Sequence, residues 1–397
     1  MKKATIILIG ILFIITGCRG SKQSETQSDN IIIVDVTANY PPKELILQDF
    51  MDVEYIPLET NDDFITMAYI QAIGKDVIIV RNRRQTSDGD IFFFDRKNGK
   101  ALKKINRQGQ GAEEYGFLLW VTLDEDNNEI IVNDRHRKIF VYDLSGKIKR
   151  SFDHKEDAIY DPVYNFDRNN LICIDYIRDY DEEPSNKFFI ISKQDGNITK
   201  EIPIPYKKKK SMELVTVDPV TGSGIASEAD NLELVPFHDS WLLVEPCADT
   251  IYSYSRDHAM KPFIVRTPSM QSMEQPEVFL FPGVLTDRYF FMQTVKKEYD
   301  FATDTGFPRN ELVYDKLENT LFKSVVYNSD FSNKKPVDMV YDITLINNNE
   351  IAFLQRIEAS DLVEAYEKGL LKGKLKEIAA GLNEESNAVI MLAKYKK

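Results

Sequence analysis

The chain has 397 residues, of which 43% are hydrophobic and 28% are charged, so it is long enough for one large core or for two domains. Its formal net charge is −13 at pH 7. This balance disfavours nucleic acid and anionic lipid headgroups as partners, because binding to phosphates requires a surplus of Lys and Arg on one face.

The first 17 residues have the pattern of a secretory signal peptide. Lys2 and Lys3 precede an uninterrupted apolar run over residues 4–15, which is too short to span a bilayer as a helix. The run ends in Ile15-Thr16-Gly17-Cys18, which resembles a bacterial lipobox. The resemblance implies that residues 1–17 are removed and that Cys18 becomes the lipid-modified first residue of an exported protein.

Residues 18–30 are predicted to form a flexible tether between this lipid and the folded body. After Cys18 they contain only polar residues and Gly, which cannot bury enough surface to fold. Arg19 follows the lipidated residue in place of the aspartate that is associated with retention in the inner membrane. We therefore expect attachment to the outer membrane, and the sequence leaves open which side of that membrane the protein faces.

Short strand-like segments separated by turns make up most of residues 31–397. Each contains about four β-branched or aromatic residues bounded by Asp, Asn, Gly or Pro, a pattern typical of strands and too short for helices. The fold class is therefore all-β. Representative segments are Val77-Ile78-Ile79-Val80, Ile91-Phe92-Phe93-Phe94, Ile130-Ile131-Val132, Phe188-Phe189-Ile190-Ile191 and Trp241-Leu242-Leu243-Val244.

Three of the turns repeat one pattern. Gly99, Gly146 and Gly196 each lie in a polar turn between two strand-like segments, where a tight hairpin requires positive φ. They recur at intervals of about 50 residues, and four short strands in such a period fit the blade of a β-propeller better than a sandwich.

Six blades of four antiparallel strands can be drawn along the chain. Their provisional limits are residues 53–105, 117–152, 161–203, 231–265, 284–327 and 340–395. A ring of blades has to close. We expect a strand from residues 31–58 to pair with the terminal strand 389–395 in the last blade, because this pairing removes free sheet edges.

Residues 131–146, with the sequence IVNDRHRKIFVYDLSG, resemble an NHL-type propeller repeat. The whole mature chain resembles the six-bladed propeller lipoproteins of Gram-negative gut bacteria, and residues 53–60, 107–115 and 387–392 carry this resemblance. Ala112 and Ala388 stand where prolines are common in that family. Since the family is largely without assigned activity, the resemblance implies a propeller lipoprotein and no shared catalytic residues.

Residues 361–382 are the exception to the β pattern. Leu362, Tyr366 and other apolar residues recur at helical spacing, and Ser360 or Asp361 can serve as N-cap. Gly369 and Gly373 are expected to divide the segment into two short helices, because Gly in a helix interior costs roughly 1 kcal/mol relative to Ala. We predict that this insertion, at about residues 360–383 of the last blade, packs against the side of the ring.

Cys173 and Cys247 are the two cysteines beyond Cys18. Both lie in apolar or strand-like surroundings, so buried free thiols are favoured over a disulfide, although one bridge stays open as an alternative in an exported protein. Three cysteines and four scattered histidines contain no zinc-binding spacing.

The segment Arg107-Gln108-Gly109-Gln110-Gly111 is the first candidate for a ligand-binding loop. Glycines spaced by one residue can expose amide donors in an anion-binding nest, and Arg107 adds positive charge. The alternative is a structural crossover between blades in which Tyr115 packs between the sheets.

Arg135 and His136 are further ligand-binding candidates, because the NHL-like pattern places their turn on one face of the ring. A lone His in a turn is more often an exposed surface residue than a general base. Trp120, Trp241 and the many tyrosines are candidates for a sugar-stacking surface. Residues 124–135 begin like a calcium loop but lack Gly at position six and Glu at position twelve, so a hairpin turn is favoured.

Two functions are compatible with these features. The first is a noncatalytic binding or scaffold module, anchored by the lipid on Cys18, that presents its loops to a glycan or to a cell-envelope protein. The second is a calcium-dependent propeller hydrolase or lyase acting on a carbohydrate or lactone, in which acidic, amide or imidazole side chains of several blades converge on the channel. The residues themselves predict no catalytic motif, metal site or cofactor, and Ca²⁺ enters only with the second function.

Overall fold

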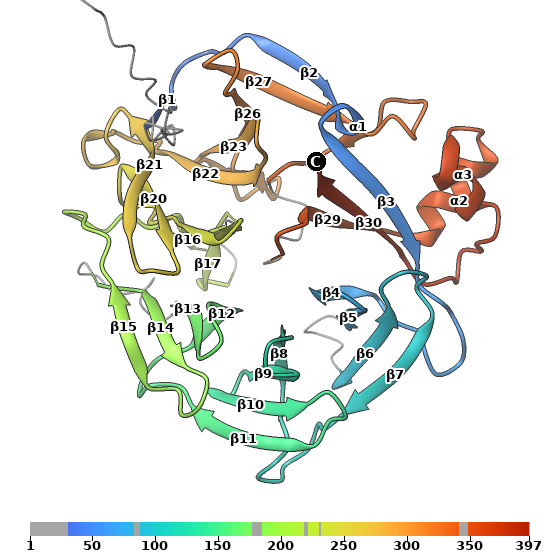
Figure 1. Ribbon diagram of the computed structural model, residues 1–397. Helices are drawn as coiled ribbons and strands as arrows, with labels where there is room; N and C mark the ends of the chain where they lie inside the picture. Colours follow the sequence, from blue (N-terminus) through green and yellow to red (C-terminus); the bar gives the residue numbers. More distant parts are fainter. Residues whose placement is uncertain are drawn as a thin grey trace, which may run out of the picture. The chain divides into compact units, whose positions relative to one another are not determined.

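The computed structural model describes residues 31–82, 88–176, 185–217, 221–229, 232–340 and 348–396. Six β-sheets are arranged as blades around a central axis (Figure 1). The predicted all-β, six-bladed propeller is therefore confirmed. The predicted signal peptide and the predicted tether lie outside the described residues.

Three blades are four-stranded antiparallel sheets whose strands follow one another from the axis outward. Strands that follow one another in the sequence are neighbours in these sheets because short connections suffice to join antiparallel strands. The first blade contains β4 (Tyr69–Ile73), β5 (Val77–Arg81), β6 (Asp90–Asp95) and β7 (Ala101–Asn106); the second contains β8 (Leu118–Asp124), β9 (Glu129–Asp134), β10 (Lys138–Asp143) and β11 (Ile148–Asp153); the third contains β12 (Tyr160–Asn165), β13 (Asn170–Asp175), β14 (Phe188–Ser192) and β15 (Ile198–Ile202).

The other three blades take up strands from the beginning of the chain. The fourth contains β18 (Leu234–Phe237), β19 (Ser240–Leu243), β20 (Thr250–Ser255), β21 (Met260–Thr267) and β1 (Ile32–Asp35); the fifth contains β22 (Val278–Leu285), β23 (Tyr289–Lys296), β26 (Arg309–Asp315), β27 (Thr320–Tyr327), β28 (Pro336–Val337) and β2 (Pro42–Ile46); the sixth contains β29 (Ile351–Ile357), β30 (Val389–Tyr395) and β3 (Met51–Pro57). Short helical turns lie at α1 (Leu47–Phe50) and η3 (Met270–Ser272).

The predicted closure of the ring is confirmed. β3 pairs antiparallel with β30, with Met51 opposite Tyr395 and Pro57 opposite Val389. This pairing also corrects the provisional first blade, which begins at Tyr69 because residues 51–57 belong to the last blade.

Two blades carry an additional parallel strand at the outer edge, and the sixth has three strands among the described residues. β1 adds to the outer edge of β21 and β2 to the outer edge of β27, both in parallel orientation. The first 27 described residues thus run along the outside of three consecutive blades (Figure 1). This covering satisfies backbone groups that would otherwise remain unpaired at two sheet edges.

The hydrophobic core is divided into several clusters that lie between neighbouring blades. In β9, Ile130 and Val132 pack toward the first blade, whereas Ile131 packs toward the third. Because successive side chains of a strand point to opposite faces, a sheet covered on both sides needs apolar residues at every position. This explains the unbroken apolar runs that mark the strands in the sequence.

The repeated turn glycines have the predicted backbone geometry. Gly99, Gly146 and Gly196 have φ of +71°, +86° and +71°. The structure adds a second reason for glycine, since a Cβ on Gly99 would lie 1.9 Å from the carbonyl oxygen of Pro57 at the end of β3 in the preceding blade. These turns therefore also set the contact between neighbouring blades.

The helical insertion consists of α2 (Ala359–Glu367) and α3 (Gly373–Ala379). Leu362 and Leu375 are fully buried in the core cluster shared by the last three blades, so the predicted packing against the side of the ring is confirmed (Figure 1). The predicted start is wrong, because Glu358 is the N-cap and makes no side-chain capping bond. Gly369, at φ +66°, follows the end of α2 as expected.

Cys173 and Cys247 are buried free thiols, as predicted. Burial raises the pKa of Cys247 to about 12. No helix in the described part of the chain is long and apolar enough to cross a membrane.

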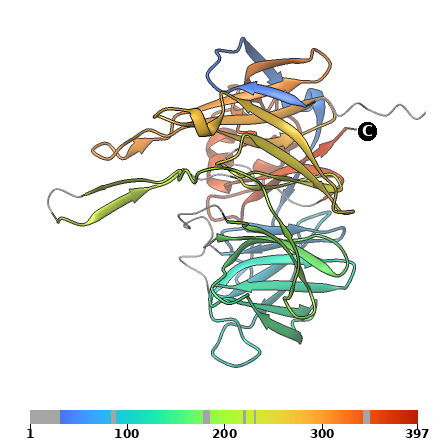
Figure 2. The same cartoon turned by 90° about the vertical axis from the view of Figure 1, so that its left-hand side faces the viewer.

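Two hairpins project from the same side of the ring (Figure 2). One is formed by β16 (Leu214–Val217) and β17 (Gly224–Ser227), which follow the third blade. The other is formed by β24 (Tyr299–Asp300) and β25 (Thr305–Gly306), which connect β23 to β26.

Candidate ligand-binding site

A cavity of about 750 Å³ opens at the centre of the ring. Its walls come from the innermost strands β4, β8 and β12 and from the turns that follow them, with further residues from the last blade and from the β20–β21 turn. Innermost strands converge on the axis in a propeller, so side chains of blades far apart in sequence line one space.

Two aromatic side chains give the cavity its apolar surface. Trp120 of β8 and Tyr164 of β12 lie edge to face, with ring centroids 6.2 Å apart. Trp241, which the sequence also suggested as a stacking surface, is buried and instead packs against Tyr164 at 5.1 Å. Among the described residues, neither the Trp120 indole N–H nor the Tyr164 hydroxyl has a hydrogen-bond partner, so both groups can bond to a ligand.

Several charged groups around the cavity are already engaged within the protein. Asp124 accepts a hydrogen bond of 2.6 Å from Lys193, and both side chains are 2% exposed. Glu125 accepts the backbone N–H of Lys75 at 2.8 Å. These bonds engage part of the charge around the cavity, whose lining also includes Lys75, Lys97, Asp126 and Glu350.

Further carboxylate and cation pairing occurs at the edge of the cavity. Glu54 lies 3.2 Å from Arg96 and 2.7 Å from Lys394. The two cations lower the pKa of Glu54 and outweigh the opposing effect of its burial. The lining therefore combines an aromatic surface with hydrogen-bonding and charged groups, to which a ligand rich in hydroxyl groups can bond.

The predicted loop at residues 107–116 is held by its own bonds. Arg107 donates from Nε to the carbonyl oxygen of Gly146 at 2.9 Å. The N–H of Gly109 bonds to the carbonyl oxygen of Tyr115 at 3.1 Å, and that of Gly111 to Glu114 Oε2 at 2.9 Å. The backbone amide of Gly111 is therefore already bonded to a carboxylate of the chain. Gln110, in contrast, is exposed to solvent.

Arg135 and His136 lie beside this loop, and buried Asp134 connects the two segments. Asp134 Oδ1 accepts from the backbone N–H of His136 at 2.7 Å and lies 2.8 Å from its Nδ1. Its Oδ2 accepts the N–H of Gly116, and the guanidinium of Arg135 lies 5.6 Å from the ring of Phe117.

The structure thus connects the turn that carries Arg135 and His136 to the C-terminal end of the predicted loop, at Gly116 and Phe117. Both segments lie, however, at the opposite end of the ring from the central cavity, because the β7–β8 and β9–β10 connections emerge on the other face from the β4–β5 and β8–β9 turns. Ligand binding by the predicted residues stays a prediction.

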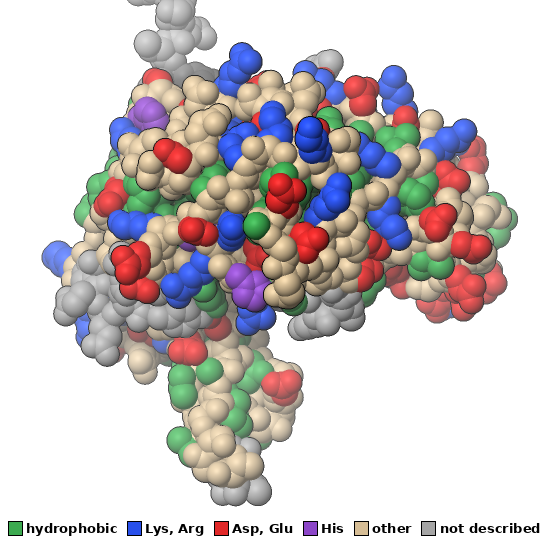
Figure 3. All heavy atoms as spheres, turned by 90° about the horizontal axis from the view of Figure 1, so that it is seen from below, with side chains coloured by type: hydrophobic (Ala, Val, Ile, Leu, Met, Phe, Trp, Pro, Cys, Tyr) green, Lys and Arg blue, Asp and Glu red, His purple; other side chains and the backbone are tan. Residues whose placement is uncertain are grey.

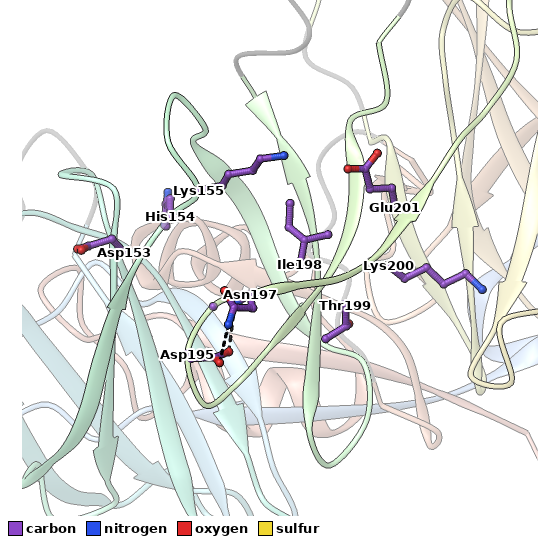
Figure 4. A pocket seen from close by; sticks show the side chains of 10 residues that line it. Asp153, His154, Lys155, Asp195, Asn197, Ile198, Thr199, Lys200 and Glu201 are labelled. Atoms are coloured by element: carbon purple, nitrogen blue, oxygen red, sulfur yellow. Dashed lines mark hydrogen bonds between the residues drawn. The ribbon is translucent and has the colours of Figure 1, made fainter.

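A second cavity of about 530 Å³ lies on the outer rim, between the end of β11 and the β14–β15 hairpin. Figure 4 shows its polar lining, in which Asn197 donates to Asp195 at 2.6 Å. His154 reaches this space but is 7% exposed and bonded on both ring nitrogens. The rim cavity therefore offers fewer uncommitted groups than the central one.

No group of three or more His, Cys, Asp or Glu side chains suitable for a metal ion occurs among the described residues. The acidic turn after β8 that begins like a calcium loop is joined instead by internal bonds, since Asn127 donates to Asp124 at 2.8 Å. This agrees with the interpretation of residues 124–129 as a hairpin turn.

Sequence reasoning named Trp120, included Tyr164 only as one of many tyrosines, and missed Gln71 and Asn165 as cavity residues. No motif marks them, because they converge only when β4, β8 and β12 meet at the axis. The available signal is weak: Tyr164 and Asn165 lie near the start of a predicted blade, whereas Gln71 does not, because the predicted first blade began at residue 53.

The six sheets and their axial cavity define the molecule as a six-bladed β-propeller. Its family model spans residues 31–394, and the chain belongs to the family described as "Domain of unknown function (DUF4934)".

One solved structure supports the fold, and a second is reported as a more distant likeness. A candidate exported protein of Bacteroides fragilis NCTC 9343 is 14% identical, with a TM-score of 0.61 over 90% of this chain and 99% of that chain. A member of the DUF4221 family from Bacteroides vulgatus ATCC 8482 is 10% identical, with a TM-score of 0.48 over 88% and 98% of the two chains. No curated protein matches the sequence.

Proposed function

We propose that this protein is an exported, lipid-anchored and noncatalytic binding module that holds a glycan in its central cavity. The observation that carries the proposal is the pairing of an aromatic surface with the unbonded Trp120 N–H and Tyr164 hydroxyl in a space of about 750 Å³. Aromatic rings pack on the apolar faces of sugars, while N–H and O–H groups bond to their hydroxyls.

The membrane is the second partner in this proposal. A lipid on Cys18 and the polar residues up to Asn30 would hold the ring within a few nanometres, or roughly 20 Å on average, of the outer membrane. Expression of the full chain and of Cys18→Ser in a Gram-negative host, with radiolabelled palmitate, tests the anchor. Loss of label and release of the variant from the membrane fraction are expected, whereas unchanged labelling would exclude lipidation at Cys18.

Glycan binding is tested on the chain from Ser21 onward with a panel of neutral and anionic oligosaccharides. A ligand at 100 times its dissociation constant stabilises the folded state by about 2.7 kcal/mol, which produces a measurable thermal shift. Trp120→Ala should weaken binding at least about tenfold, because it removes both the ring and the donor.

Tyr164→Phe should weaken binding less, because it removes only the hydroxyl. Tyr366→Phe, on the exposed surface of α2, is the matched control and should leave affinity unchanged. A glycan that binds Trp120→Ala as well as the unmodified chain would refute the central cavity as its site. A shift that requires Ca²⁺ would favour the hydrolase or lyase alternative, and no shift with any sugar would point to a protein partner.

A further inference from the structure

The outer strands of the first and second blades carry a concentration of positive charge. Residues 90–107, which include β6 and β7, contain six Lys and Arg and two Asp, and residues 137–155, which include β10 and β11, contain the same numbers. Neither segment contains Glu. Each segment therefore has a net charge of +4, in a chain whose total is −13. Figure 3 views the ring from the side of β10 and β11 and shows Lys and Arg side chains gathered there.

The two segments form one continuous surface along the rim, here called the basic band. The end of β7 contacts the turn between β10 and β11, since Arg107 donates from Nε to the Gly146 carbonyl oxygen at 2.9 Å and Lys103 donates to that of Leu144. β7 and β11 follow the circumference of the ring one after the other (Figure 1). Each has six residues and extends about 20 Å, so the cations are distributed along about 40 Å.

Most carboxylates of the basic band are engaged within the protein. Asp95 Oδ1 accepts two backbone N–H groups of its own turn at 2.9 and 3.0 Å, and Asp143 Oδ1 does the same at 2.8 and 3.0 Å. Asp90 lies 3.2 Å from Lys104. Asp153, the fourth, is exposed. The acidic side chains therefore neutralise only part of the positive charge.

Several cations of the basic band, in contrast, are not paired. Lys149 and Arg150 form salt bridges with Glu129 of β9. Four exposed lysines of the basic band form no salt bridge with any other described residue: Lys97, Lys100, Lys147 and Lys155. Their ammonium groups can bind an anion without first breaking an ion pair.

We propose that the basic band binds a linear acidic polysaccharide whose sugar units carry carboxylate groups. Lys97 and Lys100 precede β7, Lys147 precedes β11 and Lys155 follows it, so unpaired ammonium groups recur at intervals of about one strand length, about 20 Å. A small anion can contact only one of these places, whereas a polymer contacts all of them. Each exposed ion pair contributes little alone, and linked contacts add up to measurable binding.

An acidic polysaccharide fits the position of the basic band better than the anionic headgroups of a bilayer. The described chain begins beside β1, on the outer edge of the fourth blade, which lies across the ring from the first blade (Figure 1). A tether that averages roughly 20 Å holds the fourth blade near the bilayer and leaves the basic band facing away from it. This step alone rests on the proposed lipid anchor.

Calorimetric titration with polygalacturonate tests the proposal on the chain from Ser21 onward, which contains the whole closed ring. Polygalacturonate carries a carboxylate on each sugar, and its methyl ester is the matched neutral probe. In about 50 mM NaCl the acid form should bind at least about tenfold more tightly than the ester. Its affinity should fall at least about fivefold in about 200 mM NaCl, because binding releases counterions. Absence of binding at low salt, or equal binding of the ester, would overturn the proposal.

Two variants with the same change in net charge test the location of the polymer. Replacement of the four unpaired lysines of the basic band by Gln should weaken binding at least about tenfold. The matched control replaces four exposed lysines outside the basic band by Gln and should bind as the unmodified chain does: Lys316, Lys323, Lys372 and Lys376. Equal losses in the two variants would refute the basic band, since binding would then depend on total charge. Thermal unfolding verifies that both rings are folded.

Two further measurements separate the basic band from the membrane and from the central cavity. Co-sedimentation with vesicles of phosphatidylcholine and phosphatidylglycerol should leave the chain in solution; binding to these vesicles but not to polygalacturonate would assign the basic band to a membrane instead. Loss of polymer binding in Trp120→Ala, with binding retained in the variant of the basic band, would place the polymer in the central cavity. The two proposals therefore fail independently, because they concern different surfaces.

Discussion

The buried imidazole of His154 predicts a specific loss of stability at acidic pH. His154 lies against Tyr160 with centroids 4.7 Å apart. Its Nε2 lies 3.0 Å from Asn133 Oδ1, and its Nδ1 accepts the backbone N–H of Tyr160 at 3.2 Å. Asn133 uses its own amide N–H to reach the Tyr160 carbonyl, so its oxygen accepts and Nε2 carries the proton of a neutral ring.

Burial lowers the pKa of His154 from 6.5 to about 4. Above pH 6.5 the imidazole is neutral in both states and stability is independent of it. Between pH 6.5 and about 4 only the unfolded chain takes up the proton, so the free energy of unfolding falls as pH falls. At about 1.4 kcal/mol per pKa unit, this effect reaches about 3 kcal/mol.

The assay is urea unfolding of the ring at pH 7.5, 6.0 and 4.5, compared between the unmodified chain and His154→Gln. The variant should be less stable at pH 7.5 because it loses the contact with Tyr160, and the difference should shrink or reverse by pH 4.5. His136→Gln, on a side chain that is 71% exposed, controls for the loss of a histidine as such. A stability difference that is the same at all three pH values would refute the assignment of a neutral, buried His154.

Three further predictions follow from the packing of the ring. Lys193→Met should lower the free energy of unfolding, measured in urea, by about 3–5 kcal/mol, because Asp124 stays buried without its cation. The double variant Lys193→Met, Asp124→Leu should recover most of this stability. Gly99→Ala should lower the free energy of unfolding by at least about 2 kcal/mol more than Gly369→Ala does. Both glycines have positive φ, but only a Cβ at Gly99 would collide with Pro57. Equal losses of stability would contradict the role of the Gly99 turn in blade contact. Tyr115→Phe should lower the free energy of unfolding by about 2 kcal/mol, because the Tyr115 hydroxyl donates to the Gly89 carbonyl at 2.6 Å and accepts the Arg107 N–H at 3.0 Å. The glycan affinity of this variant, measured by calorimetry, should not change.

Local features of the chain were predictable because their causes lie within a few residues. The apolar runs such as Ile130-Ile131-Val132 indicate strands covered on both faces, and the polar turns with Gly99, Gly146 and Gly196 indicate tight hairpins. The helical spacing around Leu362 similarly predicted the insertion. Its start was misplaced because Glu358, which lacks a capping side-chain bond, gives no signal.

The candidate site was less accessible to sequence reasoning. A Gly-x-Gly segment attracts attention because its backbone can bind an anion, yet in the folded chain Glu114 already bonds to the Gly111 amide. The central cavity has no comparable motif. Its aromatic pair joins Trp120 to Tyr164 across two blades, and a separation of 44 residues carries no local pattern.

The sequence by itself determined the all-β class, the blade period, the need for closure, the buried thiols and the helical insertion, since each follows from periodicity, turn chemistry or the hydrophobicity of neighbouring residues. Only the tertiary structure decided that β1 and β2 add to the fourth and fifth blades, that residues 51–57 belong to the sixth blade and not to the first, and which side chains face the axis. These outcomes depend on pairings between residues more than 200 positions apart, such as Ile32 with Ile264 and Pro42 with Lys323. Many strands of similar composition could compete for the same edges, and only the closed ring selects among them.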